Sequence, residues 1–354
     1  MTALTLSRVG VHVTLLERSG PDRSRGGGIF VSDGLVERVT GWGLAPGTPP
    51  VPTTLSGGMH SWHTIFTALY AAAHQDPGIT VVHHARAITA DQDDAAAWVV
   101  ADSGAVHRAD IVIGADGHRS VVRAAVAPQH RHAAFAGYLV WIATIEERDL
   151  PERLRGHRTF DRNAFLGDDT AMLLGGSFPG EDGDSRRRHR TVGWAVYDNT
   201  HNDLLTRGGH VRDGVVHHSV AASEVPADLG QSLARLGRGR WSSTWTDLIQ
   251  VSLDAGRVIG TPISEYVPEV LADGRLAIVG DAAHVATPMT GSGFTEALHD
   301  AETLAAAIVA HPTVTDGWLD APRALESYAQ RRLMAARNTV LSGQHFSHRF
   351  RAAA

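Results

Sequence analysis

Near the end of the chain, a short apolar run changes into a helical pattern. Residues 276–279 are four consecutive apolar side chains, which is typical of a short buried strand. Gly280 and Asp281 end this run, a glycine-bearing turn follows at residues 291–293, and apolar residues then recur at helical intervals from Phe294. This combination suits a bound cofactor, because the acid accepts hydrogen bonds from ribityl or ribose hydroxyls and free helical N–H groups attract an anion. An ordinary strand-turn-helix with a conveniently placed aspartate is the alternative.

A second strand-and-acid unit lies in the first half of the chain. Residues 109–113 are predicted to be a strand, and Gly114-Ala115-Asp116-Gly117 follows it. Arg119 and Arg123 come soon after. Two such units in one chain favour a cofactor site over a pair of ordinary turns.

The chain opens with an incomplete form of a dinucleotide-binding unit. Residues 1–9 resemble the last turns of a helix that stops at Gly10, and residues 11–16 are a predicted strand closed by Glu17. In a βαβ unit, an acid in this place binds the adenosine ribose hydroxyls. The first strand and its G-x-G-x-x-G turn should precede the helix, and residues 26–28 cannot replace them because they follow Glu17. Either the chain is truncated or the phosphate-binding turn is absent, and weak cofactor binding or poor folding is then expected.

The other elements of the first third follow from turn signals and periodicity. They are a loop with one cation over residues 25–29, a short helix over 33–43, a proline-rich loop over 46–52, a helix from Ser61 (its N-cap) to Ala73, and strands over 79–82 and 97–100, the last followed by a hairpin turn at 102–104.

The predicted pattern of secondary structure changes between about residue 135 and residue 266. Strands are predicted over 138–144, 171–174 and 191–197 without long helices between them, which indicates a mostly antiparallel sheet. The expected fold is therefore α/β: a discontinuous Rossmann-like cofactor-binding domain over 1–133 and 267–354, with an inserted α+β substrate domain over 134–266. A C-terminal helix is predicted over 320–344, and residues 345–354 are expected to fray.

Composition narrows the classes of function. The 354 residues are 43% hydrophobic, enough for a large core, and the net charge of −6 gives no global field that would recruit nucleic acid. The chain has no cysteine and no lysine, which excludes disulfides, thiolate metal sites, a Walker lysine and a Schiff-base lysine. No apolar run reaches about 18 residues and no secretory signal is evident, so a cytoplasmic enzyme without membrane or nucleic-acid partners is expected.

The 21 histidines do not predict a metal site. There is no H-E-x-x-H motif, and the adjacent pairs His83-His84 and His217-His218 point apart in a strand or helix. No metal is therefore expected.

Together, these motifs resemble the single-component FAD-dependent aromatic hydroxylases, which are para-hydroxybenzoate-hydroxylase-like flavoprotein monooxygenases. The resemblance covers nearly the whole chain apart from the absent first strand. Residues 25–29, Ser61-Trp62, 178–180 and 194–199 look most like the 2,6-dihydroxypyridine hydroxylase branch.

The resemblance implies roles for the matched positions. Glu17 would hold the adenosine ribose, Asp281 the ribityl and pyrophosphate region, and Pro288 would border the isoalloxazine ring. The matched cofactor positions are Glu17, Arg25, Asp116, Gly117, Arg119, Gly280, Asp281, Pro288, Gly291, Ser292, Gly293 and Phe294.

The implied reaction uses FAD, NAD(P)H and O2. Reduced flavin would add oxygen at C4a and hydroxylate an electron-rich aromatic or N-heteroaromatic ring. Pro288 would line the reacting side, and Tyr197 or His201 on the inserted sheet are candidates to help deprotonate a phenolic substrate. A homodimer is compatible with this class. A halogenase or reductase of the same flavin superfamily, or a truncated inactive remnant, remains the alternative.

Overall fold

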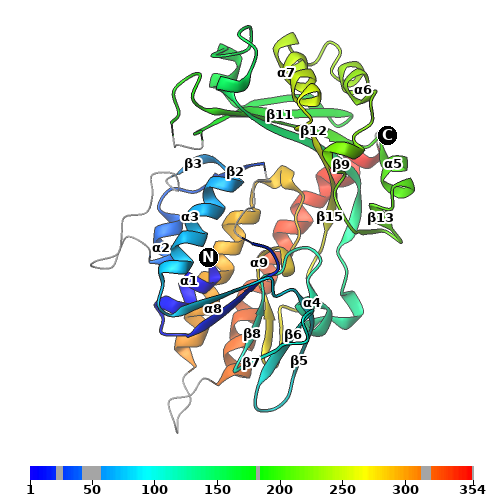
Figure 1. Ribbon diagram of the computed structural model, residues 1–354. Helices are drawn as coiled ribbons and strands as arrows, with labels where there is room; N and C mark the ends of the chain where they lie inside the picture. Colours follow the sequence, from blue (N-terminus) through cyan, green and yellow to red (C-terminus); the bar gives the residue numbers. More distant parts are fainter. Residues whose placement is uncertain (21–26, 42–56, 181–183, 312–319, 353–354) are drawn as a thin grey trace.

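The computed structural model describes residues 1–20, 27–41, 57–180, 184–311 and 320–352. A five-stranded sheet forms one end of the molecule, and small sheets packed against helices form the other (Figure 1). Arg25 and the proline-rich loop over 46–52 lie outside the described residues. Within the described ranges, no helix has the length and apolar character needed to cross a lipid bilayer.

The first part of the chain contains the expected helices and strands in order, with two further strands. These elements are α1 (Thr2–Arg8), β1 (Val13–Glu17), β2 (Gly28–Val31), α2 (Leu35–Thr40), β3 (Gly58–Ser61), α3 (Trp62–Gln75) and β4 (Ile79–His83). The two further strands, β2 and β3, were not predicted. Gly10 ends the first helical segment in a left-handed conformation, with a φ of 86°. The Ser61 hydroxyl caps α3 by accepting a hydrogen bond from the Thr64 amide at 3.0 Å, as predicted.

The loop expected over residues 25–29 is partly a strand. Gly28 and Ile29 belong to β2, which pairs with β3 in antiparallel register, Gly28 opposite Ser61. A Cβ on Gly28 would lie 2.7 Å from the Met59 methyl group, so the Met59 side chain would have to move to accommodate one.

The hairpin expected around residues 102–104 is confirmed, in a region with two strands more than predicted. It contains β5 (Ala87–Gln92), β6 (Ala97–Ala101) and β7 (Val106–Ala109), followed by β8 (Val112–Gly114) and α4 (Val121–Val126). The single strand expected over 109–113 is in fact two elements, because β7 ends before β8 begins. β5 was not predicted.

Two parallel strand pairs carry the expected acids. β1 pairs with β4, with Glu17 opposite His83. β17 (Leu276–Ile278) pairs with β8 so that Ile278 lies opposite Gly114, and β16 (Ala272–Asp273) adds an antiparallel edge strand. The β8–β17 pairing brings the two acid-bearing turns to one edge of the sheet.

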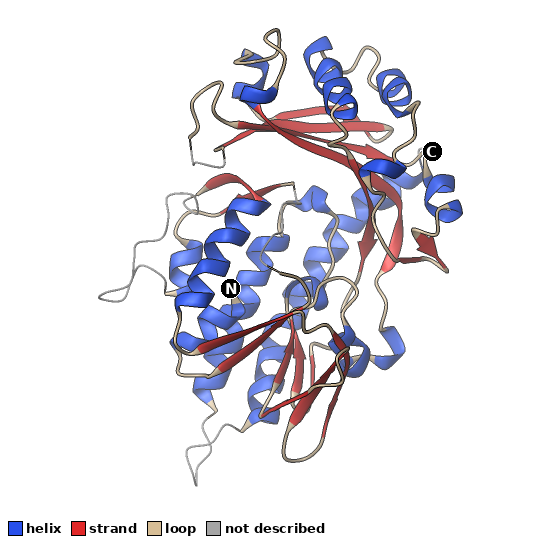
Figure 2. Ribbon diagram, in the orientation of Figure 1, coloured by secondary structure: helices blue, strands red, loops and turns tan. Residues whose placement is uncertain are grey.

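The inserted sheet is antiparallel, as predicted. Its strands are β9 (Ala134–Glu146), β10 (Ala164–Asp168), β11 (Ala171–Phe178), β12 (Thr191–Asp198) and β15 (Ile259–Glu265), in the order β10-β11-β12-β9-β15. Helices cover its outer face (Figure 2). The smaller elements of this region are α5 (Asn202–Arg207), β13 (Val211–Arg212), β14 (Val215–Val216), α6 (Leu229–Leu236) and α7 (Ser243–Asp254). Helices α6 and α7 were not predicted. The proposed domain boundaries at residues 133/134 and 266/267 stay a prediction.

The two faces of this sheet have different neighbours. On the outer face, Trp141 and Trp194 belong to a core that includes residues of α6 and α7. On the inner face, Tyr138 and Tyr197 pack with Phe350 and Met289, which come from the C-terminal helix and from the turn after β17. Adjacent residues of a strand therefore lie in different environments.

Two long helices complete the fold, α8 (Gly293–Ala310) and α9 (Ala321–Ala352). The expectation that residues beyond 344 fray is wrong, because α9 continues to Ala352 and its last turns pack on the inner sheet face. The Phe350 ring lies 5.3 Å from the Tyr138 ring in an edge arrangement, and the Phe346 ring 5.6 Å from that of Tyr197. The short 3-10 segments are Pro128–His130, Glu147–Asp149, Arg158–Asp161, Ala222–Glu224, Gly280–Ala282 and Pro288–Thr290.

Replacing Phe350 with alanine should lower the free energy of unfolding by about 3–5 kcal/mol, because the side chain is fully buried and leaves a cavity. Urea denaturation measures the change. Leu341→Ala on the same helix is the matched control, since Leu341 is 41% exposed and should change stability by less than about 0.5 kcal/mol. Equal effects of the two substitutions would contradict the docking of the C-terminal turns.

Candidate functional site

The turn after β17 holds an acid that faces outward. Gly280 has a φ of 56°, a left-handed conformation that favours glycine, and it begins the 3-10 turn containing Asp281. The Asp281 side chain is exposed, and its carboxylate accepts no hydrogen bond from the described part of the chain. Surrounding protein atoms desolvate the carboxyl and raise its pKa, an effect that the nearby His284 and Arg123 oppose. The Asp281 carboxylate is therefore available for a ligand.

A second acid lies beneath the same turn, and both of its carboxylate oxygens accept hydrogen bonds. Asp300 of α8 is fully buried and accepts hydrogen bonds from the Gly280 amide at 2.8 Å, from His284 Nε2 at 2.7 Å and from Arg332 Nε at 2.7 Å. Burial alone would raise the pKa of Asp300, but the His284 and Arg332 contacts bring it below the usual value. Arg332 also pairs with Glu296 at 2.6 Å.

Arg123 connects the two acid-bearing turns. This buried residue of α4 donates to the Ala282 carbonyl at 3.0 Å and stacks 4.4 Å from the Tyr266 ring. Its helix is capped by Ser120, whose hydroxyl accepts from the Arg123 amide at 2.9 Å, and the Asp116 carboxylate accepts from the Val121 amide at 2.6 Å. Arg123 follows the predicted Asp116 turn and Asp300 lies in the predicted helix after Phe294, but neither was predicted to be a site residue. A charged residue on an otherwise apolar helix face was the available signal.

The loop after Asp116 is positively charged. Gly117 has a φ of 80°, and the exposed Arg119 donates to the His217 carbonyl. Desolvation, followed by the charges of Arg119, Arg123 and Arg18, lowers the pKa of His118 to about 4. This potential favours an anionic ligand at the loop.

The Pro288 turn leads into the start of α8. Pro288 is exposed, Gly291 has a φ of 60°, and the Thr290 and Ser292 hydroxyls lie 2.7 Å apart. No side chain caps the first turn of α8, which leaves helical N–H groups available to an anion. A Cβ on Gly291 or Gly293 would meet open space, so a ligand can approach this backbone closely. Phe294, the next residue, instead packs into the core with α2 and α3.

Glu17 lies at the end of β1, where the sequence places it. Its carboxylate accepts a hydrogen bond from the Ser19 amide at 2.9 Å, and its carbonyl accepts from the Ala85 amide at 3.0 Å. The structure thus places Glu17 at the end of one parallel pair and Asp281 at the end of the other.

A buried chain of hydroxyls links the Pro288 turn to the inner sheet face. Tyr138 Oη lies 2.6 Å from Thr287 Oγ1 and 3.1 Å from Ser347 Oγ, and the Ser347 hydroxyl donates to Glu265 at 2.6 Å. Burial raises the pKa of Tyr138 to about 12, so the phenol keeps its proton. This hydrogen-bonded group could not be predicted from the sequence, because its four residues come from four separate segments.

The two proposed proton-transfer residues lie on opposite faces of the sheet. Tyr197 is on the inner face with Tyr138, and burial raises its pKa far above the usual value, which makes it a hydrogen-bond donor rather than a base. His201 lies on the outer face, edge-on to Trp141 and 2.5 Å from the buried Asp198 carboxylate. The structure does not bring His201 to the Pro288 turn, and the Asp198 carboxylate holds its ring on the outer face.

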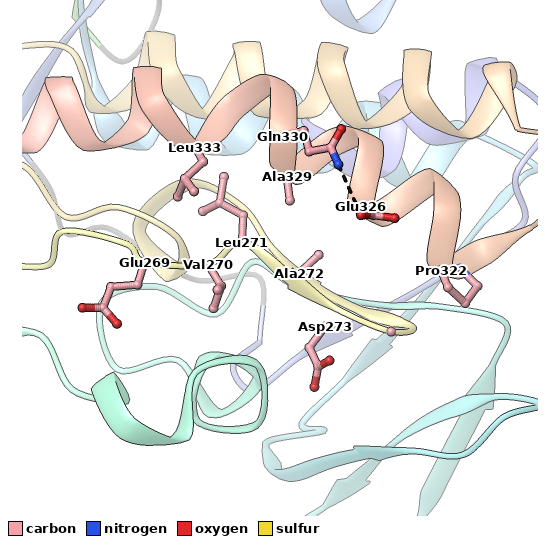
Figure 3. A pocket seen from close by; sticks show the side chains of 11 residues that line it. Glu269, Val270, Leu271, Ala272, Asp273, Pro322, Glu326, Ala329, Gln330 and Leu333 are labelled. Atoms are coloured by element: carbon pink, nitrogen blue, oxygen red, sulfur yellow. Dashed lines mark hydrogen bonds between the residues drawn. The ribbon is translucent and has the colours of Figure 1, made fainter.

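Cavities lie near the sheet and beside the C-terminal helix. One of about 310 Å³ lies between the β2–β3 hairpin and the sheet, lined by Phe30, Met59, Phe178, Pro179, Ser177 and Arg190 among others. The other, about 370 Å³, lies between β16 and α9 and is lined by residues such as Leu271, Glu326 and Leu333 (Figure 3). None of the acid-bearing turns lines the second cavity. The described residues hold no group of three or more metal-binding side chains.

The comparisons with known proteins agree with this arrangement. A family model described as an FAD binding domain matches residues 242–342. The chain is 25% identical to the 2,6-dihydroxypyridine 3-monooxygenase of Paenarthrobacter nicotinovorans over 322 residues, covering 86% of this chain and 78% of that protein. It is 21% identical to the 3-hydroxybenzoate 6-hydroxylase of Polaromonas naphthalenivorans, covering 81% of this chain and 62% of that one.

Solved structures share the fold. 2,6-Dihydroxypyridine-3-hydroxylase from Arthrobacter nicotinovorans matches with a TM-score of 0.75 and 22% identity, over 99% of this chain and 89% of that one. Klebsiella pneumoniae HpxO, solved with FAD and uric acid, matches with a TM-score of 0.70 and 19% identity, over 98% and 84%. The fold is that of the para-hydroxybenzoate-hydroxylase-like flavin monooxygenases. In sequence and fold the chain is similar to FAD-binding monooxygenases, in agreement with the resemblance seen in its motifs.

The Asp198–His201 pair predicts a pH-dependent stability. The hydrogen bond to Asp198 raises the pKa of His201 above 6.5, against the opposing effect of burial. A raised folded-state pKa stabilises the protein fully below the unfolded value near 6.5, and this contribution is lost as pH rises through the folded value. His201→Gln should therefore cost about 1–2 kcal/mol near pH 6 and clearly less at pH 9, measured by urea denaturation.

His130→Gln is the control for this experiment, because the His130–Glu269 pair is more than half exposed. A cost of His201→Gln that does not change with pH would show that the pair is not charged in the folded protein.

Proposed function

We propose that this protein is an FAD-dependent monooxygenase that uses NAD(P)H and O2 to hydroxylate a small aromatic or N-heteroaromatic compound. The observation that carries the proposal is the exposed, donor-free Asp281 carboxylate beside an uncapped helix N-terminus, inside the segment that matches an FAD binding domain.

The residues on this edge fit the parts of FAD. Asp281 suits the ribityl hydroxyls, and the open backbone at Gly291 and Gly293 suits the flavin ring, whose negative charge on reduction the α8 N-terminus stabilises. Glu17 suits the adenosine ribose, and the positive loop at Arg119 suits phosphate oxygens. When bound, FAD supplies hydride acceptance from NAD(P)H and activation of oxygen.

The inner sheet face supports an aromatic substrate. It presents Tyr197 and neighbouring apolar side chains on the same side as Met289 of the Pro288 turn. Tyr197 is 2% exposed and packs against Phe346 and Phe350, so it would support the wall of a substrate site rather than bind the substrate. The apolar side chains around it would help to exclude water from the reacting centre. The names of the relatives, which act on 2,6-dihydroxypyridine and 3-hydroxybenzoate, indicate the class of compound.

Reconstitution with FAD tests the reaction. NADH and NADPH oxidation should accelerate severalfold or more when a hydroxypyridine or phenol substrate is added, and 18O from labelled O2 should appear in the product. Bound FAD without substrate-dependent oxidation across such a panel, or a halide-dependent product, would contradict the proposal.

Asp281→Asn should weaken FAD binding by about 10- to 100-fold, because it replaces charge-assisted hydrogen bonds to the cofactor hydroxyls. Flavin fluorescence quenching measures the dissociation constant. Glu302→Gln is the matched control: Glu302 is a surface acid of α8 that pairs with Arg38, and the change should be below about threefold. Equal affinities for wild type and Asp281→Asn would remove Asp281 from the cofactor site.

A further inference from the structure

Asp300 is the most connected acid near the cofactor turn. Its Oδ2 accepts from the Gly280 amide and from His284, and its Oδ1 accepts from Arg332. All of these groups are buried. Two residues of α9 contact this region. Arg332 donates to Asp300, and Tyr328 donates to the Ile278 carbonyl at 2.8 Å, just before the turn.

The underside of the turn has its polar groups satisfied by separate helices. Asp300 of α8 takes the Gly280 amide, and Arg123 of α4 takes the Ala282 carbonyl at 3.0 Å. Since the backbone is bound from below on both sides of Asp281, its side chain is directed to the open edge. The left-handed Gly280 is the residue at which this direction is set.

We propose that Asp300 is a positioning residue for the cofactor site: by accepting the Gly280 amide it holds the turn in the conformation that presents Asp281 to the flavin ribityl chain. The inference rests on the proposed binding of FAD, but the conformational part of it is independent of any ligand. Asp300 itself does not touch the cofactor.

Asparagine cannot replace Asp300 without a loss. The carboxylate meets donors at both oxygens, whereas an asparagine amide has one acceptor oxygen and one NH2 group. In one orientation the NH2 group would face the Gly280 amide and His284. In the other orientation it would face Arg332 Nε. The charged Arg332 guanidinium forms the stronger bond to the one remaining acceptor oxygen, so the NH2 group of the introduced asparagine faces the Gly280 amide. Asp300→Asn therefore releases the turn, while the shape of the side chain is preserved.

Hydrogen exchange of the ligand-free protein tests the conformational part. In the wild type, the Gly280 amide should exchange at least about 100-fold more slowly than the amides at the uncapped start of α8, because it is buried and bonded. In Asp300→Asn, exchange over residues 280–284 should accelerate by about tenfold or more. A wild-type Gly280 amide that exchanges as fast as those of α8 would overturn the proposal without any variant.

A double-mutant cycle on FAD affinity tests the functional part. Asp300→Asn should weaken FAD binding by about 10- to 100-fold in the wild-type background and by less than about threefold in the Asp281→Asn background, since Asp300 acts through Asp281. A general loss of stability would instead give additive effects, and additivity would overturn the proposal. Glu302→Gln, on the same helix, should leave both exchange and affinity unchanged.

The two proposals fail in different ways. If the wild-type chain binds no FAD, the proposed function is wrong, and the exchange measurement still decides whether Asp300 sets the turn. If FAD binds and Asp281→Asn weakens it while the cycle is additive, the function stands and the role of Asp300 is wrong.

Discussion

The parallel pairing of β8 with β17 is the constraint on which the candidate site depends. Ile278 lies opposite Gly114, so two turns that are far apart in the sequence leave the sheet at one edge. Parallel strands require a long crossover connection, and here that connection contains the whole five-stranded sheet. The same pairing therefore creates the cofactor edge and places the inner face of the sheet next to it. Arg123, fully buried behind both turns, reinforces the pairing with side-chain bonds to the carbonyls after β17.

Two aspartates at the cofactor edge have opposite roles. Asp281 is exposed and without a donor among the described residues, whereas Asp300 is buried and accepts three hydrogen bonds. A buried carboxylate without such partners would cost several kcal/mol, so the bonds to Asp300 are a condition of its burial. An exposed carboxylate needs no such partners and can exchange water for ligand hydroxyls. A binding site of this kind requires both: a saturated underside that fixes the backbone and an unsaturated group on the open side.

Local patterns in the sequence predicted much of this fold. The helix ending at Gly10, the Ser61 cap, the antiparallel sheet and the strand-turn-helix around Asp281 all depend on periodicity and turn chemistry within short windows. Features that depend on distant partners were missed. The last turns of α9 were predicted to fray because they are polar in sequence. Their order depends on the contact of Phe350 with Tyr138, which lies more than 200 residues earlier. Helices α6 and α7 were not predicted, because strands dominate the sequence pattern on either side of them. Leu229 and Leu233 do have helical spacing.

The choice between Tyr197 and His201 shows where sequence reasoning about a site reaches its limit. Both follow from the chemistry of the expected reaction, and they are only four positions apart. Side chains alternate between the faces of a strand, so Tyr197 points to the inner face while its neighbour Asp198 points to the outer one, where it binds His201. The alternation itself is evident in the sequence, but the identity of the inner face is not. That identity comes from the aromatic residues of α9 and from Met289, which close over one face only, and it makes Tyr197 the residue of the two that shares a surface with the Pro288 turn.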